Sequence, residues 1–210
     1  MRGDADIAKI GALVADPARA RILLALGDGR ALAGPQVAEL IEALARVAPP
    51  APVRSLRQGT RAHAVRAART CYDHLAGVLG AGLMSAMLER GLLSGGDGAF
   101  DRATAQKDRL SAPGFDLDYR LTERGVDELE EFGIDFAALR ARQRPLIRYC
   151  VDWSEQRHHL AGSLGAALAD RMFELRWISR ARTGRAVHVR DEGRSGLHEK
   201  FGLELAPPTR

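Results

Sequence analysis

Aromatic residues, cysteine and long apolar runs are all scarce in this sequence. Aromatic side chains make up 5% of its 210 residues, so leucine, alanine, valine and isoleucine must fill most of the core. Two cysteines are too few for a disulfide framework, which favours a reducing compartment. No stretch approaches the roughly 20 consecutive apolar residues that cross a bilayer, and the N-terminus lacks the apolar segment of a secretory signal. We therefore expect a cytoplasmic protein without a membrane partner.

The common motifs of enzymes are also absent. The sequence contains no P-loop, no Gly-x-Gly-x-x-Gly turn after a strand, no His-Glu-x-x-His and no Gly-x-Ser-x-Gly. Each of these motifs places a nucleophile, a metal or a phosphate where catalysis needs it. We therefore expect that the chain is not an enzyme.

The charge that is present is positive and comes almost entirely from arginine. The formal net charge is +4, and the lysines are only Lys9, Lys107 and Lys200. Arginine suits bidentate contact with phosphate. A GC-rich coding genome also enriches arginine and alanine, so charge alone leaves both explanations open.

Helical patterns fill the first 48 residues. Apolar residues recur at helical spacing in residues 4–15, 18–26 and 36–47. Asp16 and Pro17 are typical of a helix N-cap followed by its first residue. A unit of this size buries little apolar surface for a stable core of its own. We therefore expect it to dimerise or to pack on the rest of the chain.

The stretch from Asp4 to Leu26 resembles the first two helices of the ArsR/SmtB family of bacterial winged-helix repressors. Its run ADPARARILLAL carries the resemblance. The later segments CYDHLAG and DWSEQRHHLAG are similar to the long C-terminal extension of one branch of these regulators. The resemblance implies a DNA-binding, helix-turn-helix transcriptional regulator that acts as a homodimer.

The sequence departs from the family after the second helix. Family members place a recognition helix and a β-wing there, whereas residues 29–32 lead directly into a segment that resembles the helix after the wing. Proteins of this fold recognise DNA bases with a helix placed in the major groove. Because that helix is missing, the resemblance does not predict that residues 1–48 recognise DNA bases. The alternative function is a regulatory dimer that does not bind DNA and whose C-terminal repeats bind a small ligand or a metal.

Two parts of the remaining chain are similar in sequence and form an internal repeat. The run HLAGSLG from His159 matches HLAGVLG from His74, and residues 189–193 resemble residues 121–125. The pattern predicts a helix over 71–93, a loop over 100–115, a short strand over 118–122 and a helix capped by Thr122. In the second copy it predicts a long helix from Pro145, a hairpin over 177–190 and a closing helix over 191–201.

The predicted fold is therefore mainly α with short β-hairpins. We expect four parts, which are a truncated ArsR-type helical unit (1–48), a Pro/Arg linker and helix (49–70), and two winged-helix-like repeats (71–142 and 143–205).

Two arginine-rich segments are candidates for contact with a DNA backbone. One is a helix expected over 54–70 with an interruption near Gly59 and Thr60, and the other is the hairpin over 177–190. The candidate residues are Arg54, Arg57, Arg61, Arg180, Arg182 and Arg185. In both segments the alternative is a solvated surface.

Cysteine and histidine side chains, which can bind metals, cluster near the second of the two similar segments. Cys150, Asp152, His158 and His159 are candidates for binding zinc or another transition metal. A symmetric site with the first copy is not expected, because six extra residues separate Cys150 from His159 and would rotate a side chain by about 240° on a helix. The alternative is a buried structural cysteine with hydrogen-bonded histidines and no cofactor.

Overall fold

The computed structural model describes residue 11, residues 56–182 and residues 184–206. Apart from Gly11, the helices expected within residues 1–48 lie outside this part of the chain, as does the proline-rich start of the linker. The chain divides into two units, residues 1–62 and residues 63–210. The helix α4 (Leu56–Ala67) is continuous, so the interruption predicted near Gly59 and Thr60 is wrong.

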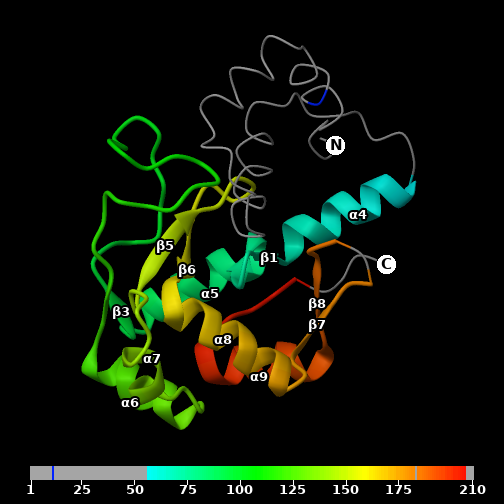
Figure 1. Ribbon diagram of the computed structural model, residues 1–210. Helices are drawn as coiled ribbons and strands as arrows, with labels where there is room; N and C mark the ends of the chain where they lie inside the picture. Colours follow the sequence, from blue (N-terminus) through cyan, green and yellow to red (C-terminus); the bar gives the residue numbers. More distant parts are fainter. Residues whose placement is uncertain (1–10, 12–55, 183, 207–210) are drawn as a thin grey trace, which may run out of the picture. The chain divides into compact units, whose positions relative to one another are not determined.

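In the second unit, the order strand, strand, helix, strand, strand, helix occurs twice (Figure 1). The first copy contains β1 (Arg69–Cys71), β2 (His74–Ala76), α5 (Gly77–Glu89), β3 (Leu93–Ser94), β4 (Arg120–Leu121) and α6 (Glu123–Glu131), and the short α7 (Phe136–Arg140) follows. The second contains β5 (Arg148–Val151), β6 (His158–Ala161), α8 (Gly162–Glu174), β7 (Ile178–Arg180), β8 (Val187–Val189) and α9 (Asp191–Phe201). The strands form separate two-stranded antiparallel pairs, so the described residues are a mixture of helices and short hairpins.

The helices predicted to begin at Cys71 and at Pro145 are wrong at their N-terminal ends. Both regions form strand pairs first, and the helices α5 and α8 begin only at Gly77 and Gly162. These two glycines have φ values of 74° and 81°, a left-handed backbone that glycine adopts without strain and that turns the chain from strand to helix. A short apolar run such as His-Leu-Ala fits a buried strand or a helix equally well, which is why the sequence pattern alone misled.

Elements with local sequence signals are confirmed. The predicted loop over 100–115 contains no helix or strand, and the predicted strand pair near the C-terminus is β7 with β8. Thr122 caps α6, because its hydroxyl oxygen accepts a 2.9 Å hydrogen bond from the backbone N–H of Gly125. The predicted closing helix is α9.

Each copy packs its helix on a strand of the other copy as well as on its own. Helix α5 packs against β6, helix α8 packs against β2, and the strands β2 and β6 are neighbours. A glycine lets each helix lie close to the strand that precedes it. A Cβ atom at Gly80 would lie 2.3 Å from the backbone oxygen of Leu75, and one at Gly165 would lie 2.6 Å from that of Leu160. The histidine of the other copy is next nearest, with its Cβ 3.5 Å from the atom added at Gly80 (His159) and 3.3 Å from that at Gly165 (His74). The repeated motif HLAG-x-LG therefore packs each helix onto the strand before it, beside the histidine of the other copy.

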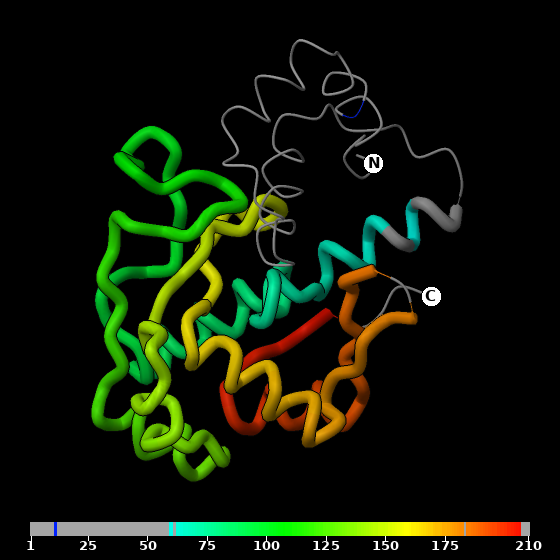
Figure 2. The backbone as a smooth tube through the Cα atoms, viewed as in Figure 1, coloured from blue at the N-terminus to red at the C-terminus, as the bar shows by residue number. Residues whose placement is uncertain are grey.

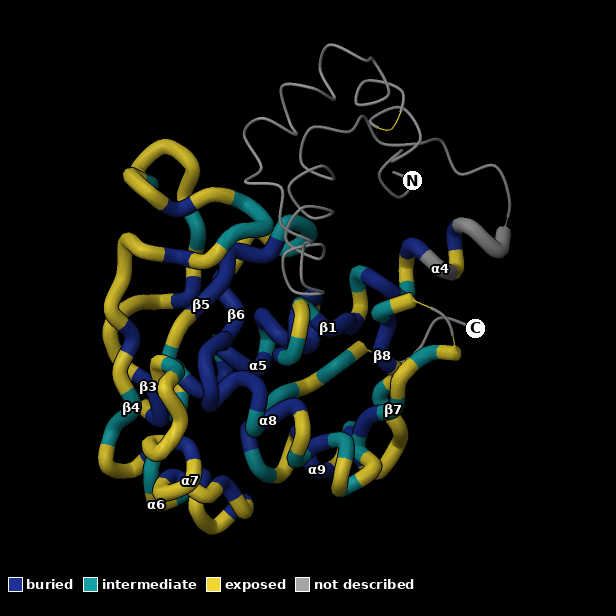
Figure 3. Tube along the Cα trace, in the orientation of Figure 1, coloured by how far each residue is buried: buried dark blue, intermediate teal, exposed yellow. Residues whose placement is uncertain are grey.

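The core lies where these helices and hairpins meet (Figure 3). Its fully buried side chains include Leu79, Met84, Leu164 and Met172, from both α5 and α8. Burying each such side chain stabilises the fold by about 1.5–3 kcal/mol. Because the core takes residues from both copies, residues 63–210 form one unit.

The long loop between β3 and β4 runs along the outer edges of β5 and β6 (Figure 2). Val151 donates its N–H to the carbonyl oxygen of Ala112 at 3.0 Å, and His158 donates its N–H to that of Gly98 at 2.8 Å. The loop thus covers strand edges that would otherwise expose unpaired backbone groups.

Replacing Gly80 by alanine should lower the free energy of unfolding by roughly 1–3 kcal/mol. The new Cβ would lie 2.3 Å from the backbone oxygen of Leu75, which cannot move without disturbing β2. Gly82→Ala in the same helix is the control, because its Cβ would meet only the end of the Leu203 side chain, at 3.0 Å. Urea denaturation measures both proteins, and equal stability of the two would contradict the close approach.

Candidate functional site

The two hairpins β1–β2 and β5–β6 place a cysteine opposite a histidine in the same way. Cys71 pairs across the strands with His74, and Cys150 pairs with His159. The ligand atoms of these four residues all lie within 4.8 Å of one another. Cys150 and both histidines are buried, Cys71 is partly buried, and neither cysteine is in a disulfide.

This arrangement corrects the expectation that the two cysteines could not be equivalent. That expectation assumed a helix, on which extra residues change the direction of a side chain. Both cysteines lie on strands instead, so the six extra residues between Cys150 and His159 only lengthen the loop that joins β5 to β6. The cross-strand pairing is unaffected.

A carboxylate stands beside each histidine. The Nδ1 atom of His74 lies 3.0 Å from Oδ1 of Asp73, within hydrogen-bond distance. The Nδ1 atom of His159 lies 3.6 Å from Oδ2 of Asp152, which is an electrostatic contact but too long for a hydrogen bond. The two carboxylates occupy the same place in the sequence, two residues after Cys71 and Cys150.

Each carboxylate is held by an arginine from the other copy. Arg144, which precedes β5, forms an ion pair with Asp73. Arg69, in β1, places its Nη2 atom 2.8 Å from both oxygens of Asp152. Asp152 also accepts a 2.7 Å hydrogen bond from the backbone N–H of Gly77, at the start of α5. Asp152 therefore joins the copies through Arg69 and Gly77.

The electrostatics of the two histidines differ. Burial would lower the pKa of His74, but the hydrogen bond to Asp73 and the neighbouring Cys71 raise it to about 9. Burial and the neighbouring His74 lower the pKa of His159. The rings stack with their centroids 5.3 Å apart, so protonation of one disfavours protonation of the other.

Several nitrogens of this cluster have no hydrogen-bond partner among the described residues. They are Nε2 of His74 and both ring nitrogens of His159, and all are buried. Buried polar atoms are nearly always satisfied, so unsatisfied ones need an explanation. Two thiols and two imidazoles are also the donor set of many tetrahedral zinc sites.

Of the four residues predicted to bind a metal, only two lie together in the structure. It brings Cys150 and His159 together, but it directs Asp152 to Arg69 and His158 to a separate network. The predicted set omitted Cys71 and His74. The signal that could have identified them is the repeated Cys-x-Asp, which precedes both copies of the His-Leu-Ala-Gly motif.

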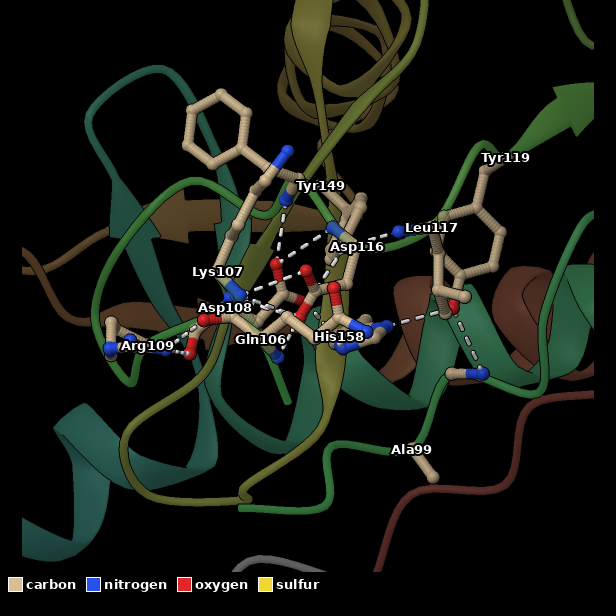
Figure 4. Close-up of polar contacts among 12 residues, drawn as sticks. Ala99, Gln106, Lys107, Asp108, Arg109, Asp116, Leu117, Tyr119, Tyr149 and His158 are labelled. Carbon is tan, nitrogen blue, oxygen red and sulfur yellow. Dashed lines mark hydrogen bonds and ion pairs between the residues drawn. The ribbon is translucent and has the colours of Figure 1, made fainter. Parts of the chain in front are cut away.

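His158 belongs to a polar network that anchors the long loop (Figure 4). Its Nδ1 atom lies 2.7 Å from the hydroxyl of Tyr119, and burial lowers its pKa. The hydroxyl of Tyr149 donates to Asp108 at 2.7 Å and accepts from the N–H of Asp116 at 2.9 Å. Burial and the hydrogen bond to Asp108 raise the pKa of Tyr149.

A cavity of about 300 Å³ lies beside this network. Asp101, Gln106, Leu117 and His158 are among its lining residues. The carboxylate of Asp116 accepts the backbone N–H groups of residues 106–108, which closes the loop on itself next to the cavity. The acids here satisfy backbone groups, which accounts for their position.

The arginines predicted to contact DNA fall into two groups. Arg54 lies outside the described residues, and Arg57 and Arg61 lie on α4. In the other group, Arg180 and Arg182 are exposed on the β7–β8 hairpin. Arg185 is partly exposed, and its backbone oxygen accepts a 2.9 Å hydrogen bond from Thr70. The structure thus presents two exposed arginines at one hairpin and ties the turn of this hairpin to β1. Within the described ranges, no helix is both long enough and apolar enough to cross a bilayer.

Comparison with known proteins defines the class: the chain belongs to the HTH-type transcriptional regulators. It is 30% identical over 242 residues to the uncharacterized HTH-type transcriptional regulator YdfF of Bacillus subtilis (strain 168), across 95% of this chain and 99% of YdfF. The alignment is longer than the chain itself, so YdfF contains residues without a counterpart here. No family model and no solved structure matches the chain.

Replacing Asp152 by asparagine should lower the free energy of unfolding by about 3–5 kcal/mol, because it leaves the buried charge of Arg69 without a partner. The matched control is Asp118→Asn, which removes an exposed partner of Arg120 and should cost less than about 1 kcal/mol. Thermal and urea denaturation measure the difference. Similar losses in the two variants would show that Asp152 does not join the copies.

Proposed function

We propose that this chain is a DNA-binding transcriptional regulator of the ArsR/SmtB type that acts in the cytoplasm as a homodimer and not as an enzyme. The observation that carries the proposal is the similarity to the HTH-type regulator YdfF across 95% of the chain. The resemblance of residues 4–26 to the opening helices of ArsR/SmtB repressors supports the finer assignment.

In this proposal the two copies in residues 63–210 are winged-helix-like, and the β7–β8 hairpin is a wing. The hairpin follows helix α8 directly and carries the exposed Arg180 and Arg182 near its turn. A basic hairpin at this position suits contact with the phosphate backbone, which fixes a protein on a duplex without reading its sequence. Arg57 and Arg61 on α4 are the second proposed group of backbone contacts.

The charge distribution supports this choice of surface. Residues 123–135 contain six acids against Arg124, and α6 exposes Glu123, Asp127 and Glu130. This segment would repel a duplex. The β7–β8 hairpin has no acid between residues 178 and 190, so it is the better surface for DNA.

The alternative is a regulatory dimer that does not bind DNA and whose C-terminal part binds a small ligand or a metal. The observation in its favour is that the segment expected to hold the recognition helix has no counterpart in this sequence. Sedimentation analysis and a DNA-binding measurement at low salt separate the two functions. A dimer that binds no duplex at low salt supports the alternative.

The Arg180→Ala/Arg182→Ala double variant should bind duplex DNA more weakly and with a shallower dependence on salt. Each lost phosphate contact reduces the slope of log K against log salt by about 1, so we expect a reduction of about 2. Fluorescence anisotropy of a labelled duplex over a series of salt concentrations measures this slope. Arg120→Ala, an exposed arginine on β4, is the control and should leave the slope unchanged. Equal slopes for all three proteins would exclude the β7–β8 hairpin as the DNA-binding surface.

A further inference from the structure

We propose that Cys71, His74, Cys150 and His159 together bind one divalent metal ion of the zinc class, in a closed four-ligand site that joins the two copies. This inference stands apart from the proposed function, since it depends only on the geometry of the β1–β2 and β5–β6 hairpins.

The distances fit a single ion. The ligand atoms of the four residues lie within 4.8 Å of one another. In a tetrahedral zinc site, bonds of about 2.3 Å to sulfur and about 2.0 Å to nitrogen separate neighbouring ligand atoms by roughly 3.3–3.8 Å. The remaining difference is of the size that small rotations of cysteine and histidine side chains provide.

The unsatisfied nitrogens are an independent observation that points to a ligand. Asp73 engages Nδ1 of His74, which leaves Nε2 buried and without a hydrogen-bond partner. His159 has its Nδ1 atom toward Asp152, and its Nε2 atom is likewise buried and unpartnered. A metal ion bound at both Nε2 atoms would satisfy them.

The surroundings are those of a metal site. A histidine that binds a metal usually presents its other nitrogen to a carboxylate, which fixes the orientation of the ring. Asp73 and Asp152 stand in that position for the two histidines. Arg144 and Arg69 in turn hold these carboxylates in place.

The donor set selects the class of ion. Thiolate and imidazole favour zinc and its transition-metal neighbours over magnesium and calcium, which require oxygen ligands. Four protein ligands in a largely buried site leave no position for a substrate, which is typical of structural zinc sites. Because each copy supplies one cysteine and one histidine, the ion would link the two copies.

The test uses the full chain, purified under reducing conditions and stripped of metal with a chelator. Zinc is titrated in competition with a chromophoric chelator, and cobalt is titrated as a spectroscopic substitute. We expect one ion per chain, intense visible bands of tetrahedral cobalt, and a thiolate-to-cobalt charge-transfer band in the near ultraviolet. The titrations contain no DNA, so their outcome is independent of DNA binding.

The variants Cys71→Ser and Cys150→Ser should each lose the charge-transfer intensity of one thiolate and bind zinc at least tenfold more weakly. His188→Asn is the control for histidine, because His188 is exposed on β8, and it should bind as the unchanged chain does. Asp73→Asn should weaken zinc binding by roughly 10–100-fold while leaving the four ligands in place.

Three results would overturn the proposal. The first is a stripped chain that is folded by circular dichroism but takes up neither zinc nor cobalt. The second is uptake whose cobalt spectrum shows no thiolate band. The third is a Cys71–Cys150 disulfide in the purified protein, detected by mass spectrometry, together with no metal uptake after its reduction. Because these results come from the unchanged chain, they remain decisive even if a variant does not fold.

Discussion

The buried ion pair between Arg69 and Asp152 is the interaction on which the arrangement of the two hairpins depends. Asp152 accepts hydrogen bonds from Arg69 and from the first N–H of helix α5, so one carboxylate connects β1, α5 and the β5–β6 hairpin. The guanidinium of Arg69 also lies over the ring of Trp153, at 4.9 Å. Both charges are almost fully removed from water, so each requires the other. The position of each copy is thereby fixed against the other.

The cysteine and histidine cluster follows from this arrangement. His74 and His159 face each other because β2 and β6 are neighbours, and the helix glycines Gly80 and Gly165 lie beside these two histidines. The same Asp152 that holds Arg69 also stands beside His159. The ion pair and the proposed metal site are thus parts of one structure, because Asp152 contacts both Arg69 and His159.

Local signals in the sequence predicted the outer elements but not the central hairpins. The cap at Thr122, the β7–β8 hairpin and α9 were predicted because turn and cap residues mark them. The turns of β1–β2 and β5–β6 use Tyr72 and Gln156 at positive φ, residues that do not signal a turn. With both hairpins taken for helix, only Cys150 and His159 of the cluster were predicted. The DNA contacts stay predictions, because Arg54 lies outside the described residues and surface charge alone does not identify a partner.

The packing of each helix on a strand of the other copy has a consequence for how the chain folds. Helix α5 packs on β6 as well as on its own β2, and α8 packs on β2 as well as on its own β6, so part of this packing joins residues about 80 positions apart in the sequence. Contacts of such long range are slow to form, because a long segment of chain must be closed first. During synthesis, the first copy leaves the ribosome before the hairpin that covers its helix exists. The repeat is therefore a doubled sequence whose single core takes side chains from both halves.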